Sequence, residues 1–146
     1  MTWASPHFTL AEITHSNTAT RLDIDNTPLA EEIANLEILA EGLEQVRTKL
    51  DSSPILISSG FRCLELNRAL KSKDTSYHIL GLAADFICPS FGNVHEVMRT
   101  LADSSIQFDQ LIIEFGRWIH IAFPKQGEKP RRQMMRIGKS GVLLYE

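Results

Sequence analysis

Residues 76–85 of the chain read Ser76-Tyr77-His78-Ile79-Leu80-Gly81-Leu82-Ala83-Ala84-Asp85, and this stretch is the most informative about the fold and its chemistry. A second histidine, His120, lies at the centre of Trp118-Ile119-His120-Ile121-Ala122. A catalytic zinc ion typically takes three protein ligands from His and Asp or Glu, and a water molecule of pKa about 7 occupies its fourth position. The two stretches therefore predict one catalytic Zn²⁺ ion held by His78, Asp85 and His120.

Strand patterns surround these ligands. The run at 83–88, which contains Asp85, predicts a strand, as do the runs at 55–60 and 108–115. A further strand at 118–123 follows the tight turn Gly116-Arg117, so we expect an antiparallel hairpin. The period of two in a strand puts His120 on the same face as Trp118 and Ala122. A small strand is also expected at 142–145.

Helix patterns account for most of the remaining chain. Thr9 and Glu12 form a capping box for a short helix. Apolar residues then recur at three- and four-residue steps up to Leu50, and Pro28 suits the first turn of this long helix. Shorter helices are expected at 64–70 and from the cap Asn93 to 102, with loops at 21–28 and 71–76.

Length and composition narrow the class of protein. A chain of 146 residues suits a single domain spanning 1–146, and typically buries roughly 70% of its unfolded surface. The net charge of −3 gives no basic field, so a nucleic-acid partner is not expected. No apolar run approaches a membrane span, and the N-terminal segment lacks the parts of a signal peptide, so we expect synthesis in the cytoplasm. Cys63 and Cys88 are expected to be buried free thiols.

The spacing of His78 and Asp85 alone is a modest signal, because such pairs arise by chance and a lone strand histidine is more often structural. The residues between and around them strengthen it. Gly81 permits a sharp turn, Ala83 leaves room beside a metal, and the Ser76 hydroxyl can orient a ligand. The whole pattern S-x-H-x-x-G-x-A-x-D is complete, and W-x-H follows downstream.

With these motifs the chain resembles the zinc D-alanyl-D-alanine carboxypeptidase family, which includes the vancomycin-resistance dipeptidases and many phage lytic peptidases. The resemblance covers nearly the whole chain, and its terminal motifs look like the small phage and prophage branch. The matching stretches are 59–62, the pattern from Ser76 to Asp85, 109–114 and 118–120, with terminal hints at 8–12, 18–21, 25–28 and 131–133.

This resemblance implies an α+β fold with a central, mostly antiparallel sheet flanked by helices and a D-Ala-D-Ala carboxypeptidase-like (Hedgehog/DD-peptidase) zinc site. It also implies hydrolysis of a peptide bond in peptidoglycan. Zinc would activate a water molecule, and a nearby carboxylate would take its proton and pass it to the leaving amine.

The base of that reaction is the point where this chain departs from the family. Many relatives place Glu, Asp or His three residues before the final histidine, whereas this chain has Arg117, which cannot act as a base at neutral pH. Glu114, at the end of the preceding strand, is the best substitute, because the hairpin turn could return its carboxylate toward the zinc. The alternative is that Glu114 is a solvated strand-end charge. Asp109 is a weaker candidate.

Other residues are candidates for binding the substrate. Arg62 follows a strand and a glycine, where its guanidinium could grip a carboxylate or the oxyanion of the attacked carbonyl; the alternative is a surface arginine. Ser76 and Trp118 are further substrate-binding candidates. Arg117 could bind an anionic group or be solvated, and the six basic residues of the tail 124–146 could favour an anionic wall or form a solvated face. The other three histidines, His7, His15 and His95, fit no ligand spacing.

The sequence thus predicts a zinc metallopeptidase that cuts peptidoglycan stem peptides or cross-links. We expect a monomeric phage or prophage lysis enzyme that stays in the host cytoplasm until a holin-type partner releases it. The bond that is cut remains open between a D,D-carboxypeptidase and an endopeptidase acting on D,D or L,D bonds. Two alternatives are a non-catalytic zinc module that binds the wall or belongs to a virion, and a cytoplasmic D,D-dipeptidase.

Overall fold

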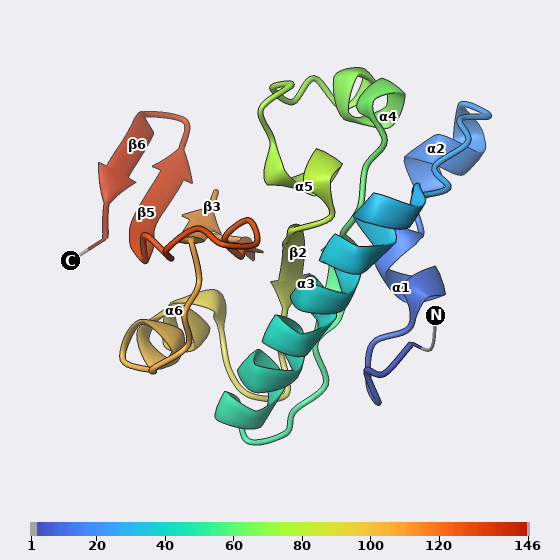
Figure 1. The fold of residues 1–146 in the computed structure, drawn as a ribbon. Coiled ribbons are helices and arrows are strands. Elements are labelled where there is room, and N and C mark those ends of the chain that lie inside the picture. Colours follow the sequence, from blue (N-terminus) through green and yellow to red (C-terminus); the bar gives the residue numbers. More distant parts are fainter. Residues whose placement is uncertain (1–2, 146) are drawn as a thin grey trace.

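The computed structural model describes residues 3–145, so Met1, Thr2 and Glu146 of the N-terminal segment and basic tail lie outside it. Its centre is a six-stranded sheet in the order β1-β2-β4-β3-β5-β6 (Figure 1). Every neighbouring pair is antiparallel except β3 and β5, which run parallel. The predicted α+β fold with a mostly antiparallel sheet is confirmed. The strands are β1 (Leu56–Ser59), β2 (Ala83–Ile87), β3 (Gln110–Glu114), β4 (Trp118–Ala122), β5 (Gln133–Gly138) and β6 (Gly141–Leu144).

Helices cover one face of this sheet. The helix α6 (Val94–Ala102) packs against β3 and β4, and the long helix α3 (Ala30–Lys49) passes in front of β2 (Figure 1). Apolar side chains of both helices join those of the strands in one core. Ile119 and Ile121 of β4 point into this core, whereas His120 between them points to the opposite face. The alternation predicted for β4 is therefore confirmed, and the metal ligands lie on the face that α3 and α6 leave uncovered.

Several predicted elements are confirmed with their caps. The Thr9 hydroxyl accepts a hydrogen bond from the Glu12 N–H at the start of α1 (Leu10–Thr14), and Asn93 and Glu96 form a reciprocal box at the start of α6. The helix α4 (Leu64–Ala69) also lies where it was predicted. The β3–β4 hairpin is present, with a turn of three residues, Phe115 to Arg117, in place of the two expected.

Other predictions of local structure were wrong or incomplete. Pro28 lies outside α3, which begins at Ala30 because Leu29 is extended and its N–H donates to the Glu32 carboxylate (2.8 Å). Two short helices were missed, α2 (Asn17–Arg21) and α5 (Tyr77–Leu80), and so was the strand β5. Cys88 is buried as expected, but Cys63 is only half-buried, because its sulfur caps α4 near the surface.

Gly60 lets the end of β1 pack directly on α1. A side chain at this position would overlap the carbonyl oxygen of Ile13, and that same oxygen accepts a hydrogen bond from the Phe61 N–H (2.9 Å). Asn26 reinforces the contact, because its amide donates to the carbonyls of Thr14 and Phe61. The N-terminal helix and the segment after β1 are therefore joined without room for a methyl group.

We expect the Gly60→Ala substitution to destabilise the protein by about 2–3 kcal/mol, the usual cost of forcing extra atoms into a packed region. The measurement is urea unfolding followed by circular dichroism. Gly138→Ala is the matched control, because a Cβ at Gly138 would meet no atom within 4 Å. Equal urea midpoints for Gly60→Ala and Gly138→Ala would contradict the prediction. They would show that β1 and α1 can separate enough to admit a methyl group without loss of stability.

Candidate metal centre

Three buried side chains from three elements meet on the open face of the sheet. Asp85 of β2 and His120 of β4 are directly paired across the two strands, and His78 comes from α5. The Asp85 Oδ1 atom lies 2.9 Å from His120 Nδ1 and 3.3 Å from His78 Nε2. One ligand atom from each residue lies within 4.8 Å of the others. The sequence-predicted ligands therefore form one compact group.

The short helix α5 brings His78 to this group. The Ser76 hydroxyl caps the helix by accepting from the His78 N–H (3.2 Å), and Gly81 ends it in the left-handed conformation with φ of +78°. A side chain at Gly81 would also press on α3, where the Glu32 carbonyl oxygen lies 3.0 Å from the position of a Cβ. Gly81 thus makes the sharp turn that was predicted, and Ser76 acts on the backbone of a ligand residue.

The donor set fits a zinc ion. His78 Nδ1 lies 2.7 Å from the carbonyl oxygen of Gly60, which can only accept, so Nδ1 carries the proton and Nε2 keeps its lone pair for a metal. Ligand atoms about 2.0–2.1 Å from a tetrahedral zinc are roughly 3.3–3.4 Å apart, close to the spacings around Asp85. Two imidazoles and one carboxylate leave a fourth position open, which is the arrangement of catalytic sites.

The ionisation states of the ligands also suit a cation. Burial lowers the pKa of His78, although the charge of Asp85 acts in the opposite direction. Burial alone would raise the pKa of Asp85, but the neighbouring His78 and His120 hold it well below its ordinary value. A deprotonated aspartate and a neutral histidine are the forms that bind zinc.

Glu114 lies beside the triad on the same face of the sheet. It is the last residue of β3 and pairs with Trp118 across the hairpin. Its Oε1 atom is 3.9 Å from His120 Nδ1, and its Oε2 atom accepts a hydrogen bond from the Trp118 indole (2.9 Å). Burial, and then the charge of Asp85, raises the pKa of Glu114 above the ordinary value. The carboxylate is therefore held at the metal group and its pKa is shifted toward neutrality.

Arg117, three residues before His120, does not share the position of Glu114 beside the triad. Its side chain is exposed at the tip of the hairpin, and its N–H donates to the Glu114 carbonyl oxygen (3.0 Å) to close the turn. The turn therefore directs Glu114 inward and leaves Arg117 at the surface.

Arg62 lies on the other side of the triad and is not a surface residue, since its side chain is only 13% exposed. Its Nη2 atom is 3.6 Å from Asp85 Oδ2. Ser59 and the fully buried Asn67 fix the guanidinium, accepting from Nε at 3.0 Å and from Nη1 at 3.3 Å. Burial lowers the pKa of Arg62, whereas Asp85 and Glu114 oppose this effect, and a guanidinium stays cationic in proteins. A fixed positive charge thus borders the site.

The two residues that fix Arg62 were not found from the sequence. Asn67 is buried on α4, five positions after Arg62, and its amide also donates to the Lys73 carbonyl oxygen (2.8 Å). The sequence signal for Asn67 is weak: it is a polar residue on the buried side of a short helix, and such a residue needs a hydrogen-bond partner. Ser59 ends β1, and no local pattern assigns its hydroxyl to Arg62.

Asp109 is engaged elsewhere. It is buried just before β3, and its carboxylate makes a two-pronged ion pair with Arg131, with Nε–Oδ1 at 3.1 Å and Nη2–Oδ2 at 2.7 Å. This pair joins the start of β3 to the segment that leads into β5. It lies at the opposite end of β3 from Glu114, which argues against Asp109 as the base.

The ion pair predicts a pH dependence of stability. The hydrogen bond from Arg131 lowers the pKa of Asp109, so the pair stabilises the fold above the unfolded pKa of about 3.9 and loses its effect as the pH falls through the lower folded value. A double-mutant cycle of Asp109→Asn and Arg131→Gln in urea unfolding should give a coupling of about 1 kcal/mol at pH 7. The coupling should shrink below about pH 4; a constant coupling down to pH 2 would contradict the assignment.

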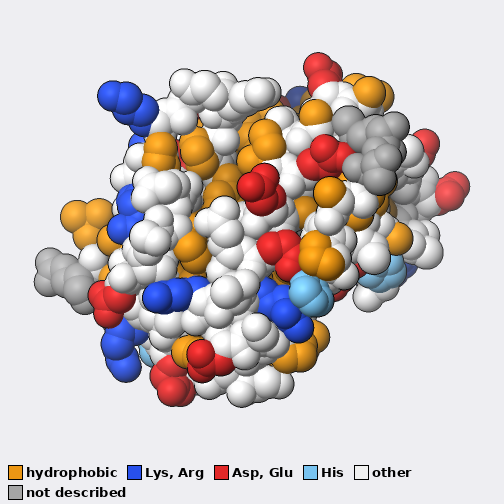
Figure 2. Space-filling view, turned by 60° about the horizontal axis from the view of Figure 1, so that its bottom comes forward, with side chains coloured by type: hydrophobic (Ala, Val, Ile, Leu, Met, Phe, Trp, Pro, Cys, Tyr) orange, Lys and Arg blue, Asp and Glu red, His pale blue; other side chains and the backbone are white. Residues whose placement is uncertain are grey.

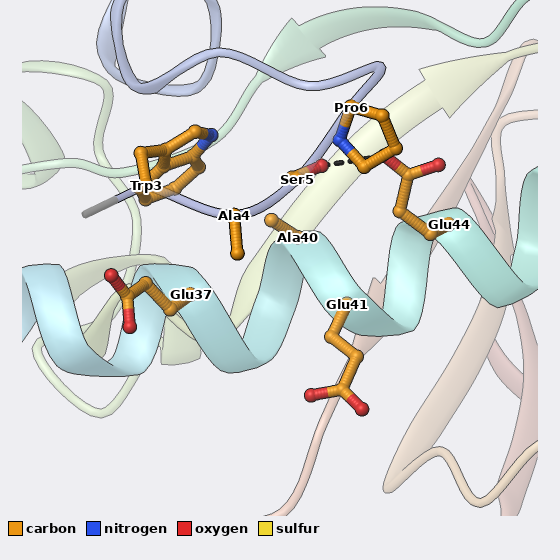
Figure 3. A pocket seen from close by; sticks show the side chains of 8 residues that line it. All are labelled: Trp3, Ala4, Ser5, Pro6, Glu37, Ala40, Glu41 and Glu44. Atoms are coloured by element: carbon orange, nitrogen blue, oxygen red, sulfur yellow. Dashed lines mark hydrogen bonds between the residues drawn. The ribbon is translucent and has the colours of Figure 1, made fainter.

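The remaining predicted residues lie away from the triad or at its border. His7 pairs with Glu44 (2.7 Å), His15 with Asn17 (3.0 Å), and His95 is exposed on α6. A pocket of about 270 Å³ lies between the N-terminal segment and α3, and its acidic lining comes from Glu37, Glu41 and Glu44 (Figure 3). None of the triad residues lines this pocket, so it is not part of the metal centre.

The comparison with known proteins agrees with this site. A family model described as Peptidase M15 matches residues 6–122, a range that contains Arg62, Glu114 and all three members of the triad. The match ends before β5 and β6. No curated protein matches the chain. Among residues 3–145, no helix has the length and apolar character needed to cross a membrane.

Proposed function

Because the chain belongs to the peptidase M15 family, we propose that it is a zinc metallopeptidase that hydrolyses a peptide bond in the stem peptides or cross-links of peptidoglycan. The family implies a DD-peptidase/Hedgehog-like zinc fold, in agreement with the mixed six-stranded sheet. The observation that carries the proposal is the buried triad of His78, Asp85 and His120 with a carboxylate 3.9 Å from one of its ligand nitrogens.

The residues around the triad divide the chemistry among them. When bound, the zinc ion supplies a polarised substrate carbonyl and a water molecule of lowered pKa. Glu114 would accept a proton from the attacking water and return it to the leaving amine, a role for which a carboxylate with a raised pKa is well suited. The Trp118 indole holds Oε2, so that Oε1 remains on the side of His120.

Arg62 completes the site as a binding group. Ser59 and Asn67 fix its guanidinium before the substrate arrives, so little side-chain freedom is lost on binding. A fixed cation can hold a substrate carboxylate or the negative charge that develops on the attacked oxygen. Ser76 stays a predicted substrate contact, although its hydroxyl already caps α5.

The biological setting is a further part of the proposal. The terminal motifs of the small phage and prophage branch support a lysis enzyme, with a holin-type partner that gives it access to the wall. On the face shown in Figure 2, Lys and Arg side chains gather toward the C-terminal hairpin, while more of the acidic ones lie toward the N-terminal side. An anionic wall would be attracted to the basic side.

The test is to incubate the zinc-loaded protein with D-Ala-D-Ala dipeptide and, separately, with whole muropeptides, and to identify the products by mass. Cleaved muropeptides are expected, and the masses will tell a carboxypeptidase from an endopeptidase. Cleavage of the dipeptide alone would indicate a cytoplasmic D,D-dipeptidase instead. Binding to wall fragments without any product would indicate a non-catalytic module.

A further inference from the structure

A second site lies next to Glu114, at the tips of two hairpins. Because β3 and β5 pair in parallel, with Glu114 opposite Ile137, the β3–β4 turn and the β5–β6 turn end at the same edge of the sheet. Between them is a groove of about 500 Å³, lined by two aromatic rings, two cations and one glycine: Phe115, Trp118, Arg117, Lys139 and Gly138. Trp118 belongs to both sites, since its indole binds Glu114.

Phe115 adopts an unusual backbone conformation beside this groove. The residue has a φ of +55°, which is rare and costly for a bulky side chain, and its ring is 50% exposed. The ring lies 5.6 Å from that of Trp118. Strain of this kind, of order 1–3 kcal/mol, is found mostly at functional sites. Here it presents an aromatic ring to solvent next to the proposed catalytic base.

The charges of the groove favour an anionic ligand. Arg117 comes from one turn and Lys139 from the other, and both are exposed. Within residues 3–145, neither makes an ion pair of 4.0 Å or less. The nearby acid, Glu114, is bound by Trp118 and directed toward His120. Two exposed cationic side chains beside two aromatic rings can bind a ligand that carries a carboxylate on an apolar or ring-bearing chain.

The position of the groove sets the length of the ligand. Neighbouring strands are about 4.8 Å apart, so β5 lies roughly 10 Å from β4, which carries His120, and roughly 19 Å from β1, which leads to Arg62. An extended dipeptide spans at most about 7 Å. A ligand that reaches the β5–β6 side of the groove, where Lys139 lies, would therefore extend about three residues beyond the attacked carbonyl.

We propose that this groove is a carboxylate-binding subsite for an extended peptide substrate, formed by Arg117 and Lys139 with Phe115 and Trp118 as its apolar walls. The inference rests on the proposed function for the identity of the substrate. Two of the five lining residues, Gly138 and Lys139, come from the β5–β6 hairpin, which lies beyond the matched residues 6–122, so the family match does not supply this side of the groove. The subsite selects peptides with a second carboxylate over dipeptides.

The first experiment compares two stem-like peptides with the same cleavable bond. They differ only at the third residue beyond that bond, which is glutamate in one peptide and glutamine in the other. A second pair has a C-terminal acid or amide at that position, so that the two sources of a carboxylate are told apart. We expect the acid to be preferred about tenfold in kcat/KM, and Arg117→Gln or Lys139→Gln to reduce the preference about threefold each. Lys129→Gln, an exposed lysine outside the groove, is the matched control and should retain the preference.

The second experiment measures binding, so that it does not depend on turnover. The cleavable amide is replaced by a CH₂–NH linkage, which contains no carbonyl, and the emission of Trp118 is followed in a Trp3→Phe background because the chain has two tryptophans. The same preference for the acid is expected. Gly138→Phe should weaken binding of the long peptide relative to binding of a dipeptide, because the new side chain fills the groove. The fold should tolerate the change, since a Cβ at Gly138 meets no atom within 4 Å.

These outcomes separate the two proposals. Absence of cleavage with a preserved preference in binding would overturn the proposed function and support the subsite. Cleavage with equal rates and equal binding for acid and amide peptides would overturn the subsite and leave the peptidase intact. A preference that survives the double substitution Arg117→Gln, Lys139→Gln would also overturn it, because the carboxylate would then be bound elsewhere.

Discussion

The His120→Ala variant is expected to lose zinc binding and hydrolysis together. Removing this residue takes away one of only three ligand atoms, and it also leaves the Asp85 carboxylate without its 2.9 Å partner. A catalytic zinc site typically needs three protein ligands, so the two that remain cannot hold the ion firmly. Metal content per chain, measured by atomic emission after dialysis, should fall from one zinc to nearly none, and activity should fall with it.

The control for this variant is His95→Ala, which removes an exposed histidine from α6 and should keep full zinc content. Circular dichroism of both variants checks that the fold is retained. A His120→Ala protein that is folded and still holds one zinc per chain would disprove the ligand assignment. A folded protein without zinc but with normal hydrolysis would disprove the metallopeptidase function itself.

The Glu114→Gln variant is expected to bind zinc normally and to lose at least about a hundredfold in turnover, the low end of general acid–base contributions. Glutamine has the same shape and can still accept the hydrogen bond from Trp118, but it cannot take up a proton. The loss should appear in kcat with little change in KM, since Glu114 acts on the water and the leaving group. Steady-state kinetics with a cleaved muropeptide measure both.

Asp109→Asn serves as the comparison, because it removes the other candidate carboxylate, which is paired with Arg131 at the far end of β3. Activity near normal in Glu114→Gln would move the base to another residue. A hundredfold loss in Asp109→Asn at a pH where the variant is fully folded would identify Asp109 as that residue. Loss of zinc from Glu114→Gln would mean that the carboxylate is a ligand.

The elements with strong local signals could be predicted from the sequence. The helix α6 has a capping box at Asn93 and Glu96, and β4 alternates strictly, so both are decided by neighbours in the chain. Pairing between distant segments could not be read in this way. The parallel contact of β5 with β3 is accompanied by the Asp109–Arg131 pair and by packing of the half-buried Met134 against the core, neither of which leaves a local pattern.

The two missed helices show a different limit. Each has only four or five residues, fewer than the periodicity of a helix needs to become visible, and each is held by one serine cap. A signal for α5 was present in Ser76 before the helix and Gly81 after it. Because Ser76 and Gly81 also belong to the metal pattern, that pattern masks the helix signal.

The candidate metal ligands could be predicted because their residue types bind zinc whatever the fold. His78, Asp85 and His120 are good zinc ligands in any fold, and a specific spacing joined them. The partners that orient the site were not predictable, because a backbone carbonyl such as that of Gly60 has no sequence signature. Likewise, the turn that sends Glu114 inward and Arg117 outward depends on Phe115 adopting a positive φ, which its residue type does not favour.

Gly60 links the metal centre to the N-terminal helix α1. Its carbonyl oxygen orients the metal ligand His78, while its missing side chain lets the same segment pack on the carbonyl of Ile13 in α1. Motion of α1 is therefore transmitted to the carbonyl that orients His78. An inhibitor that occupies the metal centre should therefore also protect α1 from proteases, which limited proteolysis with and without the inhibitor would measure.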